Sequence, residues 1–195
     1  MADLTVVLQA EMQRDQLVMR YTVRNGLGQD VYVLNRLFTS VPPRMSPDIA
    51  YVELDGANQV VRVFKGLAPM PSAGSSEPNA PRRSGPTEPV APYVTPVRAG
   101  ATYSEIVRQE APVRVYREYG HSPPRLMPPE ERIAQFRGVS FALGWYARAP
   151  GVTEAPVEAF GQKLILPAGF RGMPEIHTTR SNVVEMSIPV IVPPS

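Results

Sequence analysis

The chain has 195 residues, 43% of them hydrophobic, and its 20 basic and 18 acidic side chains leave a formal charge of only +2. This balance excludes a nucleic-acid binder that works through a strongly basic field, and the lack of cysteine excludes disulfides, thiolate metal sites and a cysteine nucleophile. The 23 prolines argue against long helices, because proline carries no N–H for hydrogen bonding. We therefore expect a single all-β domain over residues 1–195.

The first part of the chain alternates with the period of two that is typical of strands. Residues 4–8 and 17–24 each place apolar side chains on one face, namely Leu4, Val6 and Leu8, then Leu17, Met19, Tyr21 and Val23. Residues 31–36 are apolar on both faces, which predicts a more central strand. The prolines of segment 41–47 should prevent any ladder from continuing there.

A hairpin and a proline-rich segment follow. Residues 49–54 and 59–65 flank Asp-Gly-Ala-Asn, a turn sequence that tolerates positive φ. Residues 68–96 are rich in proline, glycine and serine and offer little apolar surface, so they predict an extended or disordered insertion. Residues 98–108 and 113–116 then resemble two edge strands.

The last third combines a helix signal with three further strands. Residues 129–137 have proline and acids at the start and arginine before a glycine at the end, with Ile133 and Phe136 three apart, which predicts one short helix. Large and small side chains then alternate over residues 139–146, which predicts a central core strand with Trp145 buried. Residues 162–166 and 182–192 are expected to complete the sheets.

The arrangement resembles bacterial immunoglobulin-like sandwiches, including the intracellular proteinase inhibitor type. The residues that carry this resemblance are 17–24 with the Asn25-Gly26 exit, 31–34, and Ala-Gly-Ala-Thr-Tyr-Ser-Glu at 99–105. It implies an antiparallel β-sandwich that acts as a binding or inhibitory module. The chain begins directly with a strand and holds no long apolar run, so we expect a cytoplasmic protein with no membrane contact.

Candidate catalytic and metal-binding residues do not form a recognised pattern. His121 and His177 are the only histidines, and each has a glutamate within three residues, but their separation matches no known metal site. Ser84 and Ser122 lack a nucleophile elbow. Glu130 and its neighbour Glu131 sit where a helix dipole favours acids, and the glycines at 26 and 28 lack the third glycine of a dinucleotide site. We predict no enzyme, no cofactor and no metal.

The remaining candidates point to a protein partner. Proline-rich segments are preorganised for recognition, and tyrosines are common at interfaces. We therefore expect a protein-interaction or structural module that presents segments 68–96 and 117–130, with partner contacts at Arg82, Arg83, Tyr93, Tyr116, Tyr119 and His121. An inhibitor of a proteinase, or a sandwich that binds a small ligand or carbohydrate, is the alternative. An edge strand could also join two copies of the chain. We expect no nucleic-acid partner.

Overall fold

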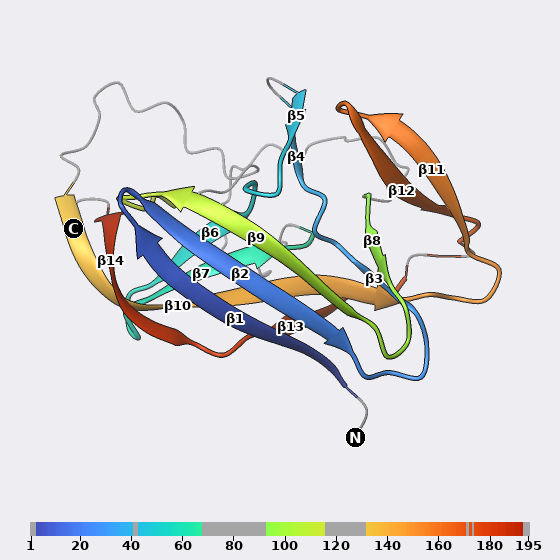
Figure 1. Ribbon diagram of the computed structural model, residues 1–195, viewed down its shortest axis with the longest axis horizontal. Coiled ribbons are helices and arrows are strands. Elements are labelled where there is room, and N and C mark those ends of the chain that lie inside the picture. Colours follow the sequence, from blue (N-terminus) through green and yellow to red (C-terminus); the bar gives the residue numbers. More distant parts are fainter. Residues whose placement is uncertain are drawn as a thin grey trace, which may run out of the picture.

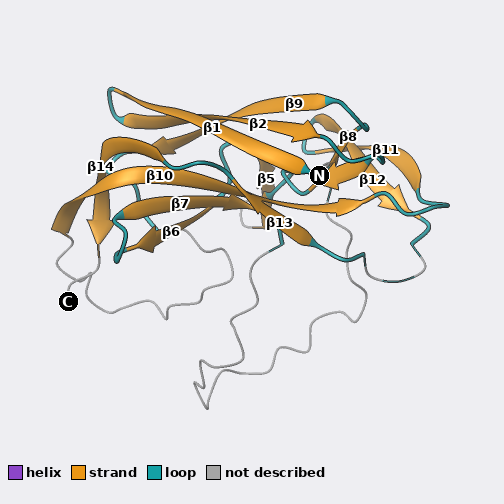
Figure 2. Cartoon of the chain, turned by 90° about the horizontal axis from the view of Figure 1, so that it is seen from below, coloured by secondary structure: helices purple, strands orange, loops and turns teal. Residues whose placement is uncertain are grey.

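A computed structural model describes residues 3–40, 43–67, 93–115, 132–170, 172 and 174–192. The described residues form strands and no helix, so none of them belongs to a helix that could cross a membrane. Two sheets lie face to face, as Figure 2 shows. The strands are β1 (Leu4–Gln13), β2 (Gln16–Asn25), β3 (Val31–Val33), β4 (Phe38–Ser40), β5 (Pro43–Met45), β6 (Tyr51–Asp55), β7 (Val60–Lys65), β8 (Thr95–Val97), β9 (Thr102–Glu110), β10 (Arg132–Ala147), β11 (Thr153–Ala159), β12 (Gln162–Ala168), β13 (His177–Arg180) and β14 (Val184–Val192).

The first sheet, sheet A, has three antiparallel strands in the order β1-β2-β9 and lies in front in Figure 1. Its inner face holds the apolar residues that the alternation predicts, since Leu17, Met19, Tyr21 and Val23 are all fully buried. Its outer face carries Arg20, Thr22 and Arg24, as expected. The predicted first two strands are therefore confirmed, and the edge strand predicted at 98–108 corresponds to β9, which begins at Thr102 and ends at Glu110.

The second sheet, sheet B, is organised around β10, which is the longest strand. One edge of β10 pairs with β7 and then β3, and the other edge pairs with β14 and then β13. The β6–β7 hairpin is confirmed, and β8 extends the sheet beyond β3. The β7–β10 pair is parallel, so the expectation of a purely antiparallel sandwich is wrong at this pair. The sheet is mixed because a long connection returns the chain in the same direction beside β7.

The main core lies between the two sheets and joins β2 to β10. The Tyr21 ring stacks on Phe141 with centroids 4.3 Å apart. Phe141 and Leu143 are buried, which confirms the predicted central strand. Trp145 is only partly buried, because it lies at the rim of the core, where its indole N–H donates to Thr179 and its ring packs on His177. The prediction that Trp145 is buried is therefore confirmed only in part: it packs against the core with Phe141 and Leu143 but keeps some exposure.

The short helix predicted at residues 129–137 is also wrong, because residues 132–137 begin β10 and pair with β14. A β-bulge between Phe136 and Gly138 shifts the register. Phe136 and Val139 are both buried, so the inward phase of the alternation changes within this part of β10. Ile133 instead lies on the opposite side of the strand and is 62% exposed.

Two small ribbons, β4–β5 and β11–β12, rise from the same side of the sandwich in Figure 1. The β4–β5 pair shows that the prolines of 41–47 do not prevent a ladder. A second core lies at the base of the β11–β12 ribbon and contains Tyr32, Leu34, Val94, Tyr146 and Val152. Two-stranded ribbons are marginally stable alone, so this core explains why the ribbon is ordered.

The insertion predicted at 68–96 extends too far at its C-terminal end, because residues from 93 onward contact the sheets. The N–H of Val94 donates to the carbonyl of Ile165 on the outer edge of β12, and Thr95 begins β8, so the part of the insertion from residue 93 onward is ordered. Residues 68–92 lie outside the described part of the chain. Val113 forms one bridge with Val190, so the predicted strand at 113–116 is reduced to this contact within the residues described.

Candidate functional site

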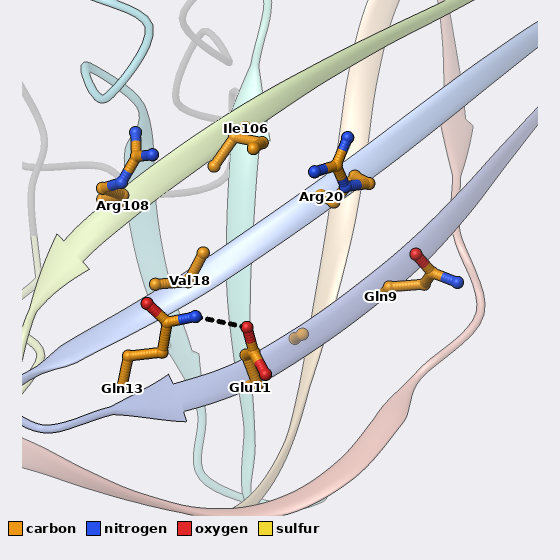
Figure 3. A pocket seen from close by; sticks show the side chains of 8 residues that line it. Gln9, Glu11, Gln13, Val18, Arg20, Ile106 and Arg108 are labelled. Atoms are coloured by element: carbon orange, nitrogen blue, oxygen red, sulfur yellow. Dashed lines mark hydrogen bonds between the residues drawn. The ribbon is translucent and has the colours of Figure 1, made fainter.

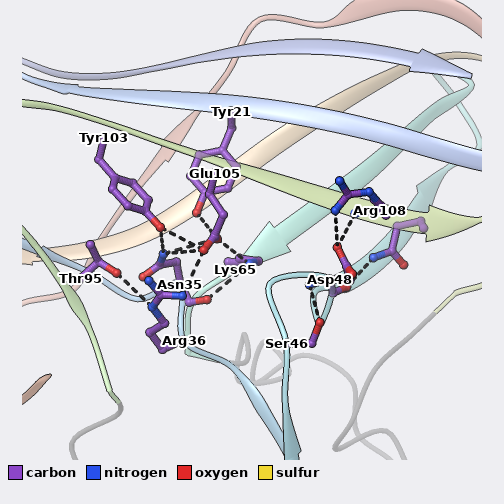
Figure 4. A network of polar contacts seen from close by, with 11 residues as sticks. Tyr21, Asn35, Arg36, Ser46, Asp48, Lys65, Thr95, Tyr103, Glu105 and Arg108 are labelled. Atoms are coloured by element: carbon purple, nitrogen blue, oxygen red, sulfur yellow. Dashed lines mark hydrogen bonds and ion pairs between the residues drawn. The ribbon is translucent and has the colours of Figure 1, made fainter. Parts of the chain in front are cut away.

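Among the described residues, the largest group of buried polar side chains lies between the sheets and surrounds Glu105 (Figure 4). Glu105 points inward from β9, next to Tyr103 and opposite Tyr21 on β2. Lys65 is the last residue of β7 and is 0% exposed. Asn35 and Arg36 follow β3 and complete the set, which we call the Glu105 cluster.

Hydrogen bonds converge on the two oxygens of the Glu105 carboxylate. Oε2 accepts from Lys65 Nζ at 2.8 Å and from the Tyr21 hydroxyl at 2.7 Å. Oε1 accepts from the Tyr103 hydroxyl at 2.9 Å and from Arg36 Nη1 at 3.3 Å. The carboxylate therefore uses both oxygens to connect β2, β7 and β9 with the segment after β3.

Asn35 adds hydrogen bonds to two other members of the cluster, Tyr103 and Lys65. Its side-chain nitrogen donates to the Tyr103 hydroxyl at 3.0 Å, and its backbone carbonyl accepts from Lys65 at 3.4 Å. Its side-chain oxygen is buried and makes no hydrogen bond. Such an unpaired acceptor reduces the benefit of the cluster, because its desolvation is not compensated.

The charges in the cluster shift the pKa of each titratable member. Burial acts to raise the pKa of Glu105, but the charge of Lys65 and the hydrogen bonds from Lys65 and Tyr21 outweigh it, so the pKa lies below its ordinary value. Burial lowers the pKa of Lys65, although the Glu105 charge opposes this. Burial and the same carboxylate raise the pKa of Tyr103 to about 12 and raise that of Tyr21 well above 10. At neutral pH the cluster holds an ion pair and two neutral tyrosines.

The geometry suits a structural role better than a chemical one. The donors of the cluster point at Glu105 or at a neighbour within the cluster, apart from Arg36 Nε, which donates to the Thr95 hydroxyl of β8. Buried polar networks of this kind fix the relative position of the elements that supply them. Here they hold sheet A over the end of β7.

A second group of charges anchors the base of the β11–β12 ribbon. Arg98 binds both carboxylate oxygens of Glu154, at 2.9 and 3.0 Å, and binds Asp30 at 2.8 Å. Arg148 lies 3.5 Å from Asp30 and 3.7 Å from Glu154. Bidentate pairs restrain geometry more than single contacts do, so this network orients the ribbon relative to the sandwich.

Three aromatic rings meet at the tip of that ribbon, and we call them the aromatic patch. The ring of Phe160, in the β11–β12 turn, lies 5.5 Å from that of Phe38 and 6.4 Å from that of Tyr93. Phe38 is 36% exposed and Phe160 is 37% exposed. Of the six partner-binding residues predicted, Tyr93 is thus placed in an exposed aromatic group, whereas Arg82, Arg83, Tyr116, Tyr119 and His121 lie outside the described residues.

Of the candidate metal-binding and catalytic residues, His177 and Glu175 lie in the described part of the chain. The Nδ1 atom of His177 lies 4.0 Å from the carboxylate of Glu175, while the imidazole packs on Trp145. Within the described ranges, no group of three or more histidine, aspartate or glutamate side chains is arranged to hold a metal ion. Ser84, Ser122, Glu130 and Glu131 fall outside these ranges.

Side chains cover backbone groups at both edges of sheet A, where an edge strand was expected to join two copies of the chain. Asn182 donates to the Leu8 carbonyl at 3.1 Å and accepts from the Leu8 N–H at 2.9 Å, so it takes the place of a strand on β1. Asp48 accepts from the Arg108 N–H at 2.8 Å on the edge of β9. Side chains that cover edge groups in this way reduce strand addition.

Sequence reasoning missed the Glu105 cluster, although a signal was present. Lys65 continues the buried alternation of Val61 and Val63, and Glu105 lies between Tyr103 and Val107 in the same phase of β9. A charge at an inward position on each of two strands predicts that the two charges pair. It does not reveal which neighbours would surround them.

No family model matches this chain, and no curated protein or solved structure is significantly similar to it. The resemblance to immunoglobulin-like domains therefore stays a prediction, and function must be argued from the residues themselves.

Proposed function

We propose that this chain is a non-enzymatic protein-interaction module, built as an immunoglobulin-like sandwich, that contacts its partner through the aromatic patch. The observation that carries the proposal is Phe160. It occupies the left-handed backbone region at φ 53°, followed by Gly161 at φ 69°, in a two-residue hairpin turn. Asparagine and glycine suit such a turn, whereas a bulky aromatic residue is rare there.

The cost of that conformation supports a role for the side chain. A left-handed conformation costs a residue with a Cβ atom about 1 kcal/mol or more. Phe160 offsets this cost by packing on Phe38 and Tyr93, yet the residue remains 37% exposed, so apolar surface is left free for a partner. Strain at a non-glycine position is a reason to suspect function, and aromatic side chains dominate protein interfaces.

The edge of the ribbon supports contact through side chains rather than through strand addition. In a two-residue hairpin every second residue of a strand forms no backbone hydrogen bond to its partner strand and turns its N–H and C=O groups to the free edge of the ribbon. On β11 these residues are Glu154, Pro156 and Glu158. Proline lacks an N–H, and charged residues at an edge disfavour pairing. The other edge of the ribbon is bonded to Val94.

Substitution of Phe160 with asparagine separates function from folding. The variant should stay within about 1 kcal/mol of wild type, because relief of the turn strain offsets the lost contacts with Phe38 and Tyr93. Partner capture should fall roughly thirty-fold, because truncation of a hot-spot aromatic residue costs about 2 kcal/mol. Ile133→Ser is the matched control, as Ile133 is an exposed apolar residue away from the patch.

The partner is identified by placing a photo-crosslinking phenylalanine analogue at position 160, with position 133 as the control site, in the native host. A protein crosslinked from position 160 alone, and no longer captured by Phe160→Asn, supports the proposal. Equal capture by wild type and Phe160→Asn would refute it. If the captured protein is a proteinase that the chain inhibits, the alternative of an inhibitory module is supported instead.

A further inference from the structure

The outer face of sheet A has a shallow hollow of about 350 Å³, shown in Figure 3. In the register of the sheet, Arg20 lies opposite Ile106, and Val18 lies opposite Arg108. The two aliphatic residues therefore occupy one diagonal of a square, and the two arginines occupy the other. Val18 and Ile106 are partly buried in the hollow, while both arginines are exposed at its rim.

Two arginines and one glutamate line the hollow, so its lining carries a net positive charge, while Glu110 lies on the same face two residues beyond Arg108. Arg20 makes no ion pair with any described residue, and Arg108 has only a long contact of 4.0 Å with Asp48 at the edge of β9. Glu11 is the one acidic side chain that lines the hollow, and it accepts a hydrogen bond from Gln13. Two guanidinium groups beside two aliphatic side chains favour a ligand that carries carboxylates on short apolar stems.

We propose that this hollow binds an acidic segment of a partner protein, in extended conformation, with glutamates at alternate positions. Diagonal neighbours in an antiparallel sheet are about 7 to 8 Å apart, and alternate residues of an extended chain repeat every 7 Å or so on one face. Two such glutamates can reach Arg20 and Arg108 together. Their methylene groups then cover Val18 and Ile106. This surface is independent of the aromatic patch.

The test uses the full chain labelled with ¹⁵N and the peptide acetyl-Ala-Glu-Ala-Glu-Ala-Glu-Ala-amide. Titration should shift the backbone amide signals of Val18, Arg20 and Ile106, and the shifts should shrink as salt is raised, because exposed charges are screened. Arg20→Gln should weaken binding about two- to five-fold, the range for one exposed ion pair. Val18→Thr, which keeps the shape and removes apolar surface, should weaken it as well.

Arg24→Gln is the matched control, because Arg24 is exposed on the same face of β2 and does not line the hollow. It should bind the peptide as wild type does. Equal loss in the Arg20 and Arg24 variants would indicate unspecific attraction and overturn the proposal. The same holds if the glutamine version of the peptide or inorganic phosphate produces the same shifts, or if the glutamate peptide produces none.

Discussion

The sharpest test of the energetics is to remove the buried charges at Lys65 and Glu105 separately and together. Glu105→Gln keeps the shape of the side chain but removes its charge and leaves one accepting oxygen, which can serve Lys65 and Tyr21 or Tyr103 and Arg36, but not both pairs. Loss of one partner from a buried ion pair costs about 3 to 5 kcal/mol. At this chain length each kcal/mol lowers Tm by roughly 2 to 4 °C.

Lys65→Met should cost less, roughly 1 to 3 kcal/mol. It leaves the Glu105 carboxylate with Tyr21, Tyr103 and Arg36 as donors. The double variant removes both charges, so its cost should fall below the sum of the two single costs by about 1 to 3 kcal/mol. Arg36→Gln is the control at the same carboxylate and should cost under about 1 kcal/mol, because Arg36 is partly exposed.

Urea unfolding of the four variants, followed by the fluorescence of Trp145, measures these free energies. Midpoints should shift without a change in the slope m, since the surface exposed on unfolding stays the same. Additive single costs, with a coupling energy below about 0.5 kcal/mol, would refute the view that Lys65 and Glu105 act as a pair. So would a Glu105→Gln variant as stable as wild type.

Three further predictions concern pH and the edge of sheet A. The folded-state pKa of Glu105 is lowered, so the stability that its charge contributes is present above about pH 4.3 and is lost as the pH falls through the folded-state pKa. In Lys65→Met the Glu105 carboxylate lacks the lysine charge. Acid unfolding of this variant should therefore start at a higher pH than that of wild type. The pKa of Tyr103 is raised to about 12, so the stability that its neutral hydroxyl contributes is present below about pH 10 and is lost as the pH rises toward 12. The absorbance of tyrosinate should therefore appear together with unfolding. The variant Tyr103→Phe should unfold at a different alkaline pH. Asn182→Ala removes two hydrogen bonds to Leu8, so it should cost about 1 to 3 kcal/mol and expose the β1 edge. Light scattering should then detect association that increases with concentration, whereas an unchanged monomer signal would contradict an edge-covering role for Asn182.

The period of two in the sequence was sufficient to predict the strands with one apolar face, such as β1 and β2, because burial on one side imposes that alternation. It failed at the start of β10, where the Ile133–Phe136 spacing suggested a helical face although the two side chains lie on opposite sides of the strand. Local patterns also could not predict that β7 runs parallel to β10, since this depends on the connection between them. The neighbours that surround the Lys65–Glu105 pair could not be predicted for the same reason, because they meet only once both sheets are in place.

The central position of β10 has a consequence for how the protein is made. β3, β7, β13 and β14 all pair with this strand, which begins only at Arg132. Sheet A is complete once Glu110 has left the ribosome, whereas most of sheet B must wait for a strand that is synthesised later. Non-local pairings of this kind slow folding, and an apolar sheet that waits for its cover is prone to aggregation. Nascent chains stalled between Glu110 and Arg132 should therefore be the form most dependent on chaperones.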